Sequence, residues 1–549
     1  MPEIILKNVT KRYGDFYAVE NINLTIPDDS FITLLGPSGC GKTTTLRMIA
    51  GLETPTTGKI TINGETVFDS DAGINVSANK RHVGFLFQNY ALWPHMTVYK
   101  NIQFGLANVD QVMPVHASEY ERLLRMQKVV VEKEKLAGCF KSSLDKKGKI
   151  EPKKALLNLI DTFEISMYSA KELFQALANK NVAVWQPILD QLGDEYKKMA
   201  EENLQKLESK GFEVNDKFDL VQNKQVVAKK RHLDKEEIDL RIRRVARIVK
   251  VGEFMDRYPN ELSGGQQQRV AIARTLAPGP KVLFMDEPLS NLDAKLRLEM
   301  RSELKRLHHD TGATFIYVTH DQLEAMTLAT RICLINNGVV QQYDAPLDVY
   351  KHPNNLFVAD FVGNPAINLI EAKAKQDKEG IHLSLFGSQV KATFIPNTYV
   401  DLAQFRKEMD QETQAKKAEY EKKLKQKSFV VKGNADKPFN FHILTINGNL
   451  DSKDEKDIQN DDYVIGIRPE FMRIEDDGKL ETDVYSAMPS GMETTVKLRV
   501  GEFIITSVVF GGVDYKVNAK AKVNIIGKEI LLFDRKTQKL IAAGELKLE

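Results

Sequence analysis

The chain has 549 residues, enough for three or four domains, and 42% of them are hydrophobic, which suffices for ordinary cores. Its 77 Lys and Arg residues nearly balance 75 Asp and Glu residues, which excludes a strong overall field that would draw it to nucleic acid or anionic lipid. Three widely spaced cysteines, Cys40, Cys139 and Cys333, exclude a disulfide framework, show no metal-ligand spacing and fit a reducing cytoplasm.

Residues 1–106 begin β-rich and continue as α/β. Short strands are predicted at Ile4–Val9 and Ile22–Ile26. Phe31–Leu35 is a continuous apolar run that enters a glycine loop, as a buried parallel strand does. Thr43–Gly51 then continues as a helix. This order of strand, glycine loop and helix predicts a layered α/β sheet.

The glycine loop fits the G-x-x-x-x-G-K-[ST] phosphate-binding pattern at every fixed position. Backbone N–H groups of such a loop wrap the β-phosphate, and the lysine supplies charge to the β- and γ-phosphates. The Thr43 hydroxyl can ligate Mg²⁺. We interpret Cys40 as a small loop residue and not as a redox sensor, because only Lys42 is certain to lie near it. The predicted nucleotide-binding residues here are Gly36, Pro37, Ser38, Gly39, Cys40, Gly41, Lys42, Thr43 and Thr44.

Residues 107–231 differ in composition from the segment before them. They are rich in Lys, Glu, Gln, Leu and Ala and contain no glycine loop of the phosphate-binding kind. Pro187 starts a helical pattern in which apolar residues recur at three- to five-residue spacing. We predict a small helical domain with charged outer faces. Gly and Pro residues interrupt this segment, so it does not carry the sustained heptad repeat of a long coiled coil.

Residues 232–350 return to the α/β style. Ser263, Gly264 and Gly265 open a helix that continues with Gln266, and their N–H groups at the positive dipole end form an anion site. Lys281–Met285 is a buried strand that ends in Asp286 and Glu287. Asp286 is placed for a Mg²⁺ shell, and Glu287 for a general base acting on the attacking water. A further strand is predicted at Thr314–Thr319.

Residues 351–549 have the pattern of a small β-barrel, interrupted by a charged helical insertion at about 401–455. The helix itself is predicted from Asp401 to about Gln426 and should be solvated. The predicted strands are Ile381–Leu385, Val390–Ile395, Tyr463–Ile467, Thr494–Val500 and Glu529–Phe533.

Leu262-Ser263-Gly264-Gly265-Gln266, placed after the phosphate loop and before the acidic strand, resembles the signature of ATP-binding cassette (ABC) proteins. The resemblance implies a P-loop ABC ATPase domain over roughly 1–106 and 232–350, with the insertion growing from its helical subdomain. By the same resemblance Gln88 is the Q-loop glutamine touching Mg²⁺ and water, His320 is the switch histidine at the γ-phosphate, and Asp293 lies in the D-loop. Tyr13 matches the aromatic that stacks on adenine, although it could also be a core or edge tyrosine. The implied catalytic set is Lys42, Gln88, Glu287 and His320, and the implied metal set is Thr43, Gln88 and Asp286.

Other segments resemble the maltose-type sugar importers of this family. Tyr90–Val98 is similar to the segment that receives the coupling helix of a permease. Pro353–Asn368 resembles the hinge after the cassette, and Leu289–Arg297 is also close to this subfamily. Ile467-Arg468-Pro469-Glu470 resembles a motif of the C-terminal OB-like (TOBE) regulatory domain. The implied fold class is therefore α/β followed by an all-β OB-like domain.

The resemblance implies an ATP-hydrolysing importer subunit that uses ATP and Mg²⁺. ATP at Lys42 of one copy would meet Ser263 and Gly265 of another, in a homodimer or heterodimer of ATPase subunits. No run approaches the roughly 20 apolar residues that cross a bilayer, and the first residues lack a signal-peptide core. We therefore expect a peripheral protein at the cytoplasmic membrane face, held by transmembrane permease subunits and served indirectly by an extracytoplasmic solute-binding protein, with no nucleic-acid partner.

A carbohydrate is the expected solute, with polyamine and glycerol phosphate as alternatives and a non-transport ABC ATPase as the alternative of another class. Ser263 lies 221 positions after Lys42, far more than is usual in the family. The insertion responsible is either a tolerated surface addition or a contact to the permease or to a cytoplasmic regulator.

Overall fold

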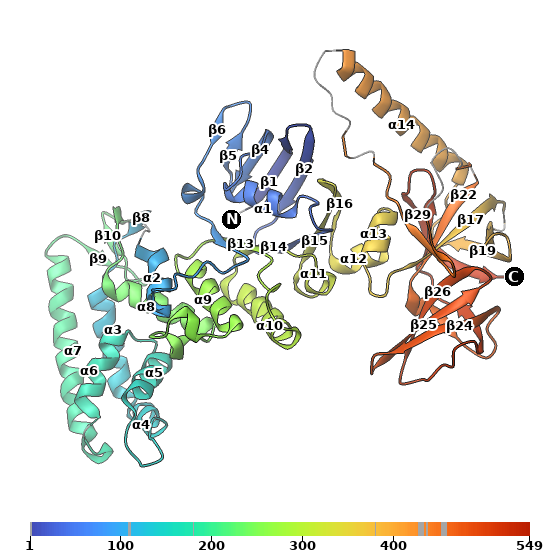
Figure 1. The fold of residues 1–549 in the computed structure, drawn as a ribbon. Coiled ribbons are helices and arrows are strands. Elements are labelled where there is room, and N and C mark those ends of the chain that lie inside the picture. The colour runs from blue at the N-terminus through green and yellow to red at the C-terminus, as the bar shows by residue number, and fades with distance from the viewer. Residues whose placement is uncertain are drawn as a thin grey trace. The chain divides into compact units, whose positions relative to one another are not determined.

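The computed structural model describes residues 3–107, 111–178, 180–378, 380–425, 433–434, 437–451, 458–459 and 461–549. The chain forms two compact units, one of Met1–Arg81 with Ile316–Glu549 and the other of His82–Phe315. Figure 1 gives the elements of both units in chain order.

The first unit begins with an antiparallel sheet. Its strand order is β2-β1-β4-β5-β6, and its strands are β1 (Ile4–Tyr13), β2 (Phe16–Ile26), β4 (Thr57–Ile62), β5 (Glu65–Asp69) and β6 (Ile74–Asn75). The two predicted strands are confirmed, and both are longer than their apolar runs because turn residues continue the pairing: Tyr13 faces Phe16.

The phosphate loop of this unit lies between a buried strand and a helix, as predicted. β3 (Phe31–Leu35) is fully buried and pairs in parallel with β15 (Arg331–Asn336), which pairs antiparallel with β16 (Val339–Asp344). α1 (Lys42–Ala50) follows the loop, and α11 (Gln322–Leu328) packs near β3. Parallel strands linked through helices make this an α/β arrangement.

The second unit contains its own parallel pair, β7 (Gly84–Leu86) with β13 (Val282–Asp286). Helices α2 (Val98–Ala107), α8 (Lys235–Ile248) and α9 (Gly264–Leu276) pack against one another, and α10 (Ala294–Thr311) follows β13. β14 (Thr314–Val318) is entirely buried and is one residue shorter than predicted.

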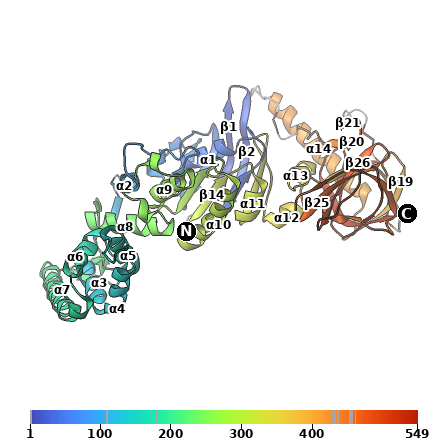
Figure 2. The same cartoon turned by 60° about the horizontal axis from the view of Figure 1, so that its bottom comes forward.

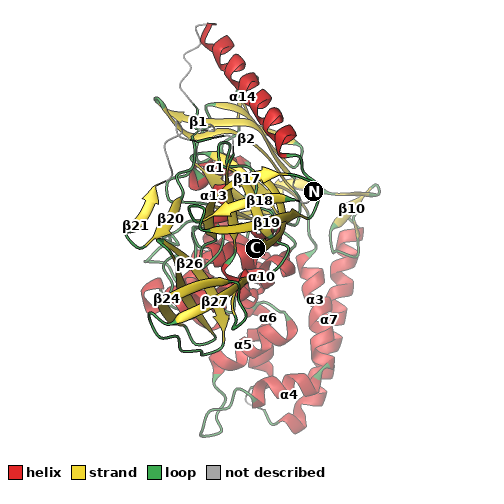
Figure 3. Cartoon of the chain, turned by 90° about the vertical axis from the view of Figure 1, so that its right-hand side faces the viewer, coloured by secondary structure: helices red, strands yellow, loops and turns green. Residues whose placement is uncertain are grey.

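The insertion is a helical bundle with its own core, as the sequence predicted. Large buried side chains such as Phe140, Trp185 and Tyr196 fill it, and α3 and α7 lie side by side (Figures 1 and 3). α7 begins two residues before Pro187, so the proline occupies its first turn, where no N–H is needed. The helices are α3 (Ser118–Val131), α4 (Lys133–Lys141), α5 (Pro152–Phe163), α6 (Met167–Leu177) and α7 (Trp185–Glu208).

Helices alone do not complete the insertion, since five short strands also belong to it. β8 (Gln111–Pro114) and β12 (Ala228–Arg231) pair antiparallel with Gln111 opposite Arg231, so the two ends of the insertion meet. β9 (Glu213–Val214), β10 (Leu220–Gln222) and β11 (Gln225–Val226) form a second small sheet. The sequence analysis predicted a small helical domain and did not predict these strands, because two- to four-residue strands carry no readable alternation.

The C-terminal part is all-β around a closed barrel, seen as a ring of strands in Figure 2. After α12 (Pro346–Lys351) and α13 (Leu356–Phe361), the barrel order is β17 (Asn368–Gln376), β18 (Ile381–Leu385), β19 (Val390–Pro396), β29 (Leu540–Leu548), β28 (Ile530–Asp534) and β22 (Asp462–Ile467). A seven-stranded sheet follows the order β21 (Gly448–Asp451), β20 (His442–Thr445), β26 (Phe503–Phe510), β25 (Glu493–Val500), β24 (Leu480–Pro489), β27 (Lys520–Ile525) and β23 (Met472–Ile474).

The expected barrel is therefore confirmed, but one small barrel does not account for this part. The run predicted at Thr494–Val500 became β25 of the second sheet, and one hydrophobic core continues from the barrel into that sheet. The charged helix is α14 (Leu402–Lys425); Gln426 and part of the 401–455 segment lie outside the described residues. In the part of the chain that the structure describes, no helix is long and apolar enough to span a membrane.

Candidate functional site

The phosphate loop is shaped by glycines that no other residue could replace. Gly36 and Gly41 have φ values of +151° and +102°, in the region that L side chains rarely adopt. A Cβ on Gly36 would lie 2.1 Å from the Ile335 carbonyl oxygen, and one on Gly41 would lie 2.4 Å from the Ala18 oxygen. The loop is thus held closely by β15 and β2.

Lys42 is buried beneath this loop at the start of α1. Its ammonium Nζ donates to the Gly36 and Pro37 carbonyl oxygens, each at 2.8 Å, so its position is fixed by the loop itself. Cys40 is buried beside it, and burial raises the pKa of the thiol although Lys42 opposes this. A thiol held protonated in this way agrees with the prediction of a small loop residue. Thr43 and Thr44 are partly buried on the first turn of α1.

The same unit brings the predicted switch histidine to this loop. The Thr319 N–H donates to the Leu34 oxygen at 3.2 Å, so exposed His320 lies beside the end of the strand that enters the loop. Behind it, Tyr317 and Thr319 each donate to buried Glu324 at 2.7 Å, which fixes the turn.

Tyr13 lies at the end of β1 with 50% of its surface exposed, so the core alternative for this residue is excluded. The Lys11 ammonium is 4.7 Å from the centre of its ring. An exposed aromatic ring beside a cation is suited to stacking on a base. An edge tyrosine and an adenine-stacking tyrosine both remain compatible with this position.

The second unit gathers the acidic strand end, the predicted Q-loop glutamine and the D-loop. Asp286 is buried at the end of β13, and Glu287 follows it at φ +46°, a left-handed conformation that is strained for glutamate. Ser290 Oγ donates to the Glu287 carbonyl at 2.9 Å and accepts from Gln88 Nε2 at 3.4 Å. Asp293 caps α10 by accepting from the Leu296 N–H at 2.9 Å.

The predicted anion site at the start of α9 has the capping geometry inferred from its residues. Ser263 is the N-cap, its hydroxyl accepts from the Gln266 N–H, and the Gln266 side chain accepts from the Ser263 N–H at 2.9 Å. Ser263 and Gly264 are exposed. Gly265 is buried, and a Cβ on it would lie 2.5 Å from a Leu296 methyl, so it serves close packing against α10.

The structure therefore places Lys42 and His320 in the same unit, and in the other unit it links Gln88 and Glu287 through Ser290. Sequence reasoning missed the residues that hold the Tyr90–Val98 segment. Buried Asn101 exchanges hydrogen bonds with Trp93 and also donates to Met96 and Thr97. Arg274 donates to the Tyr90 and Ala91 carbonyls at 2.7 and 2.6 Å. These contacts leave Trp93 42% exposed on a fixed loop.

Arg468, in the motif noted at Ile467–Glu470, fastens the barrel to the segment before it. It is 2% exposed and donates to the backbone carbonyls of Tyr350, Ala359 and Val362. Its guanidinium lies 4.0 Å from the centre of the Tyr350 ring, and the Tyr350 hydroxyl donates to Glu470 at 2.6 Å. The arginine of this charged motif is thus buried and anchors the barrel to the segment that precedes it.

Comparisons with known proteins agree with these local features. A family model described as ABC transporter matches residues 19–290. The trehalose/maltose import ATP-binding protein MalK of Thermococcus litoralis is 35% identical over 377 residues, 69% of this chain and 68% of that protein. The spermidine/putrescine import ATP-binding protein PotA of Aster yellows witches'-broom phytoplasma is 36% identical over 378 residues, which are 68% of this chain and 76% of that protein. The sn-glycerol-3-phosphate import ATP-binding protein UgpC of Rhodopseudomonas palustris is 34% identical over 404 residues, which are 73% of this chain and 75% of that protein.

Proposed function

Because this chain belongs to the ABC transporter family and is an ATP-hydrolysing subunit of the import type, we propose that it drives uptake of a carbohydrate. The observation that carries the ATP-dependent part of the proposal is the presence in one chain of a glycine-shaped phosphate loop and an exposed, capped helix start at Ser263. The three relatives named above, all import proteins, support this reading over the non-transport alternative.

In this proposal two copies sandwich two ATP molecules. Lys42 and the loop amides of one copy hold the β- and γ-phosphates, while Ser263 of the other copy donates to the same γ-phosphate. Glu287 orients and deprotonates the attacking water, and His320 contacts the γ-phosphate. Catalysis is mostly positioning and charge neutralisation. Support comes from the strained Glu287 backbone and from the exposure of both Ser263 and His320.

Mg²⁺ is the metal that this site would use. Thr43, Gln88 and Asp286 offer a hydroxyl, an amide and a carboxylate, and such oxygen donors are what Mg²⁺ prefers beside substrate phosphates. When bound, the ion would neutralise phosphate charge.

The Glu287→Gln variant tests the proposed catalytic role. We expect ATP turnover to fall by about 100-fold or more, since the amide cannot accept the proton. ATP-dependent dimerisation should remain, seen by light scattering as a rise from 62.1 kDa to about twice that mass. Glu299→Gln, the same change at an exposed position on α10, is the matched control. Brisk turnover by Glu287→Gln would remove the general-base role.

Coupling to a permease is proposed for the loop that carries Trp93. Its backbone is held by Asn101 and Arg274 while its ring stays exposed, as a docking surface for a transmembrane partner requires. The chain would then lie at the cytoplasmic membrane face, dependent on permease subunits and, through them, on a solute-binding protein.

The class of transported solute is the most specific part of the proposal. Carbohydrate is favoured by the Leu289–Arg297 and Pro353–Asn368 segments, whereas overall identity favours no class, being 34–36% to sugar, polyamine and glycerol-phosphate proteins. The test is uptake by vesicles containing the full chain copurified with its permease. Labelled maltose should enter with ATP, and not with the Glu287→Gln variant. Entry of spermidine or glycerol 3-phosphate instead would replace the carbohydrate assignment.

A further inference from the structure

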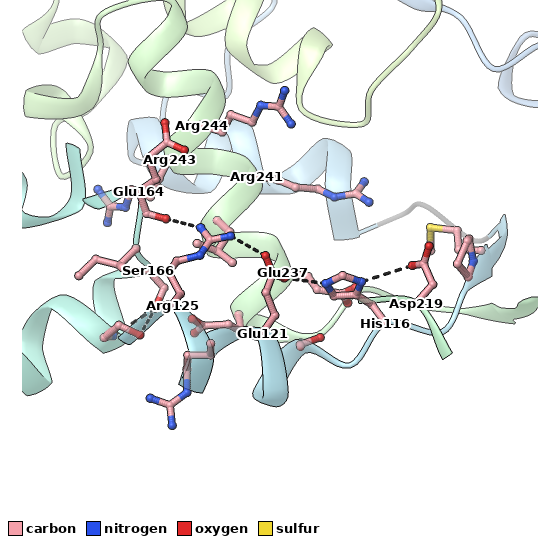
Figure 4. Close-up of a pocket in the computed structure, with 18 of the residues that line it drawn as sticks. His116, Glu121, Arg125, Glu164, Ser166, Asp219, Glu237, Arg241, Arg243 and Arg244 are labelled. Carbon is pink, nitrogen blue, oxygen red and sulfur yellow. Dashed lines mark hydrogen bonds and ion pairs between the residues drawn. The ribbon is translucent and has the colours of Figure 1, made fainter. Parts of the chain in front are cut away.

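The second unit contains a pocket whose lining includes none of the residues given a nucleotide role above. It has a volume of about 610 Å³ and is enclosed by the base of the insertion and by α8 (Figure 4). The size falls within the range of small-molecule sites. What distinguishes this pocket is its charge, because arginines outnumber carboxylates around it.

Four of these arginines already pair with carboxylates outside the pocket or at its wall, the first being Arg122 with Glu119 at 2.7 Å. Arg125 pairs with Glu121 at 2.5 Å, Arg231 pairs with Glu237 at 2.6 Å, and Arg247 pairs with Glu164. The Arg125 pair lies within α3, the Arg231 pair joins β12 to α8, and the Arg247 pair joins α8 to the end of α5. Of the carboxylates that line the pocket, Asp219 faces His116 at 3.4 Å, and Glu236 takes part in none of these pairs.

The remaining arginines, Arg241, Arg243 and Arg244, all come from α8 (Figure 4). Arg243 is 6% exposed, yet its Nε and Nη1 atoms have no hydrogen-bond partner. Its nearest carboxylate, Asp239, is 3.5 Å from Nε, and the guanidinium lies 5.6 Å from the centre of the Tyr99 ring. A buried guanidinium with unsatisfied N–H groups is costly unless an anion meets it.

Arg241 and Arg244 add to the excess. Among the described residues neither forms an ion pair with a carboxylate. Burial is the main cause that lowers the pKa of Arg241; Glu237 opposes it, and the neighbouring charges of Arg231 and Arg244 add to it. Arg244 is exposed at the edge of the pocket.

The rest of the lining suits an organic anion better than a bare ion. Ile165, Leu240 and Met113 supply apolar surface, and Ser166 and Ser169 supply hydroxyls. Guanidinium groups match the oxygens of phosphate in a fixed fork. We propose that this pocket binds a small phosphorylated organic molecule, with its phosphate on the α8 arginines and its organic part against the insertion.

This site goes beyond ATP hydrolysis and gives the insertion a role of its own. Its walls come from both the insertion and α8, so a bound molecule joins the two. Helix α8 also packs against α2, which carries part of the Trp93 loop support, and against α9, which begins after Ser263. The bound anion therefore stabilises the insertion against the helices of the proposed nucleotide and permease surfaces.

The test uses the full chain with Lys42→Ala, which removes phosphate binding at the glycine loop. Calorimetry with glucose 6-phosphate and with inorganic pyrophosphate should show saturable binding with a Kd of about 1 mM or tighter, and both probes should raise the thermal unfolding midpoint. Glucose, which lacks the phosphate, should not bind.

Two further variants locate the binding. Arg244→Glu changes an exposed side chain, so folding should be kept, and it should weaken both probes by about tenfold or more. Arg241→Gln is the second variant and should act in the same direction. Lys235→Ala, which removes a cation from α8 outside the pocket, is the matched control and should bind normally. Absence of binding by both probes, or equal binding by Arg244→Glu, overturns the proposal.

Discussion

At the scale of single residues, backbone crowding decides the phosphate loop. Gly36 and Gly41 are both placed where a Cβ would meet a carbonyl oxygen of a neighbouring strand, so the motif's glycines are required by space as well as by φ. Lys42 could be predicted from the motif, and its two carbonyl acceptors follow from the same tight loop. Glu287 differs: its position was predicted, but its left-handed backbone was not.

A second residue gives the insertion a pH dependence. His116 lies 2.7 Å from Glu121 and 3.4 Å from Asp219, with Glu237 also near, and the Glu121 hydrogen bond is the main cause that raises its pKa. Because the pKa of His116 is higher in the folded chain than in the unfolded chain, its protonated imidazole stabilises the fold. This stabilisation is complete below about pH 6.5, the unfolded value, and is lost as pH rises through the folded value.

We therefore expect His116→Gln to destabilise the chain by about 1–2 kcal/mol at pH 5.5 and by less at pH 9. Thermal unfolding at the two pH values measures this difference. His309→Gln is the control, because that side chain is 90% exposed. A loss of stability by His116→Gln that is equal at both pH values would contradict the assignment.

At the scale of elements, the β8–β12 ribbon explains how the insertion is tolerated. Pro114 faces Ala228 across it, so the chain leaves and returns at neighbouring points and the cost of closing the loop is small. The helical bundle beyond the ribbon has its own buried core. Local patterns predicted its long helices, whereas the ribbon depends on pairing between segments more than a hundred residues apart.

Excision of residues 115–227, with a two-residue turn joining Pro114 to Ala228, tests this element. We expect the shortened chain to fold and to hydrolyse ATP within about twofold of the full chain, because the ribbon preserves the ends. It should lose glucose 6-phosphate binding. ATP hydrolysis and vesicle uptake are measured together. Normal hydrolysis with lost uptake indicates a permease contact by the insertion, and failure to fold contradicts the ribbon argument.

At the scale of the whole molecule, Arg468 ties the barrel to the chain that precedes it. Replacing it with Met leaves the Tyr350, Ala359 and Val362 carbonyls without this donor, and should cost about 3 kcal/mol. The segment 350–368 should then be cleaved faster by trypsin. Arg473→Met, a change of the same kind at an exposed position, should leave cleavage unchanged. Equal protection of the Arg468→Met chain would remove the anchor role.

The sequence by itself determined the α/β class, the phosphate loop, the capped start of α9, the buried strand before Asp286 and the presence of a C-terminal barrel. Each of these is encoded by neighbouring residues through φ preference, capping or alternation. Only the tertiary structure decided that Thr494–Val500 joins a second sheet, that Arg468 is buried against the hinge, and that α8 presents its arginines to a pocket. Those features arise where segments distant in sequence meet, and there burial and the supply of counter-charges depend on the whole chain.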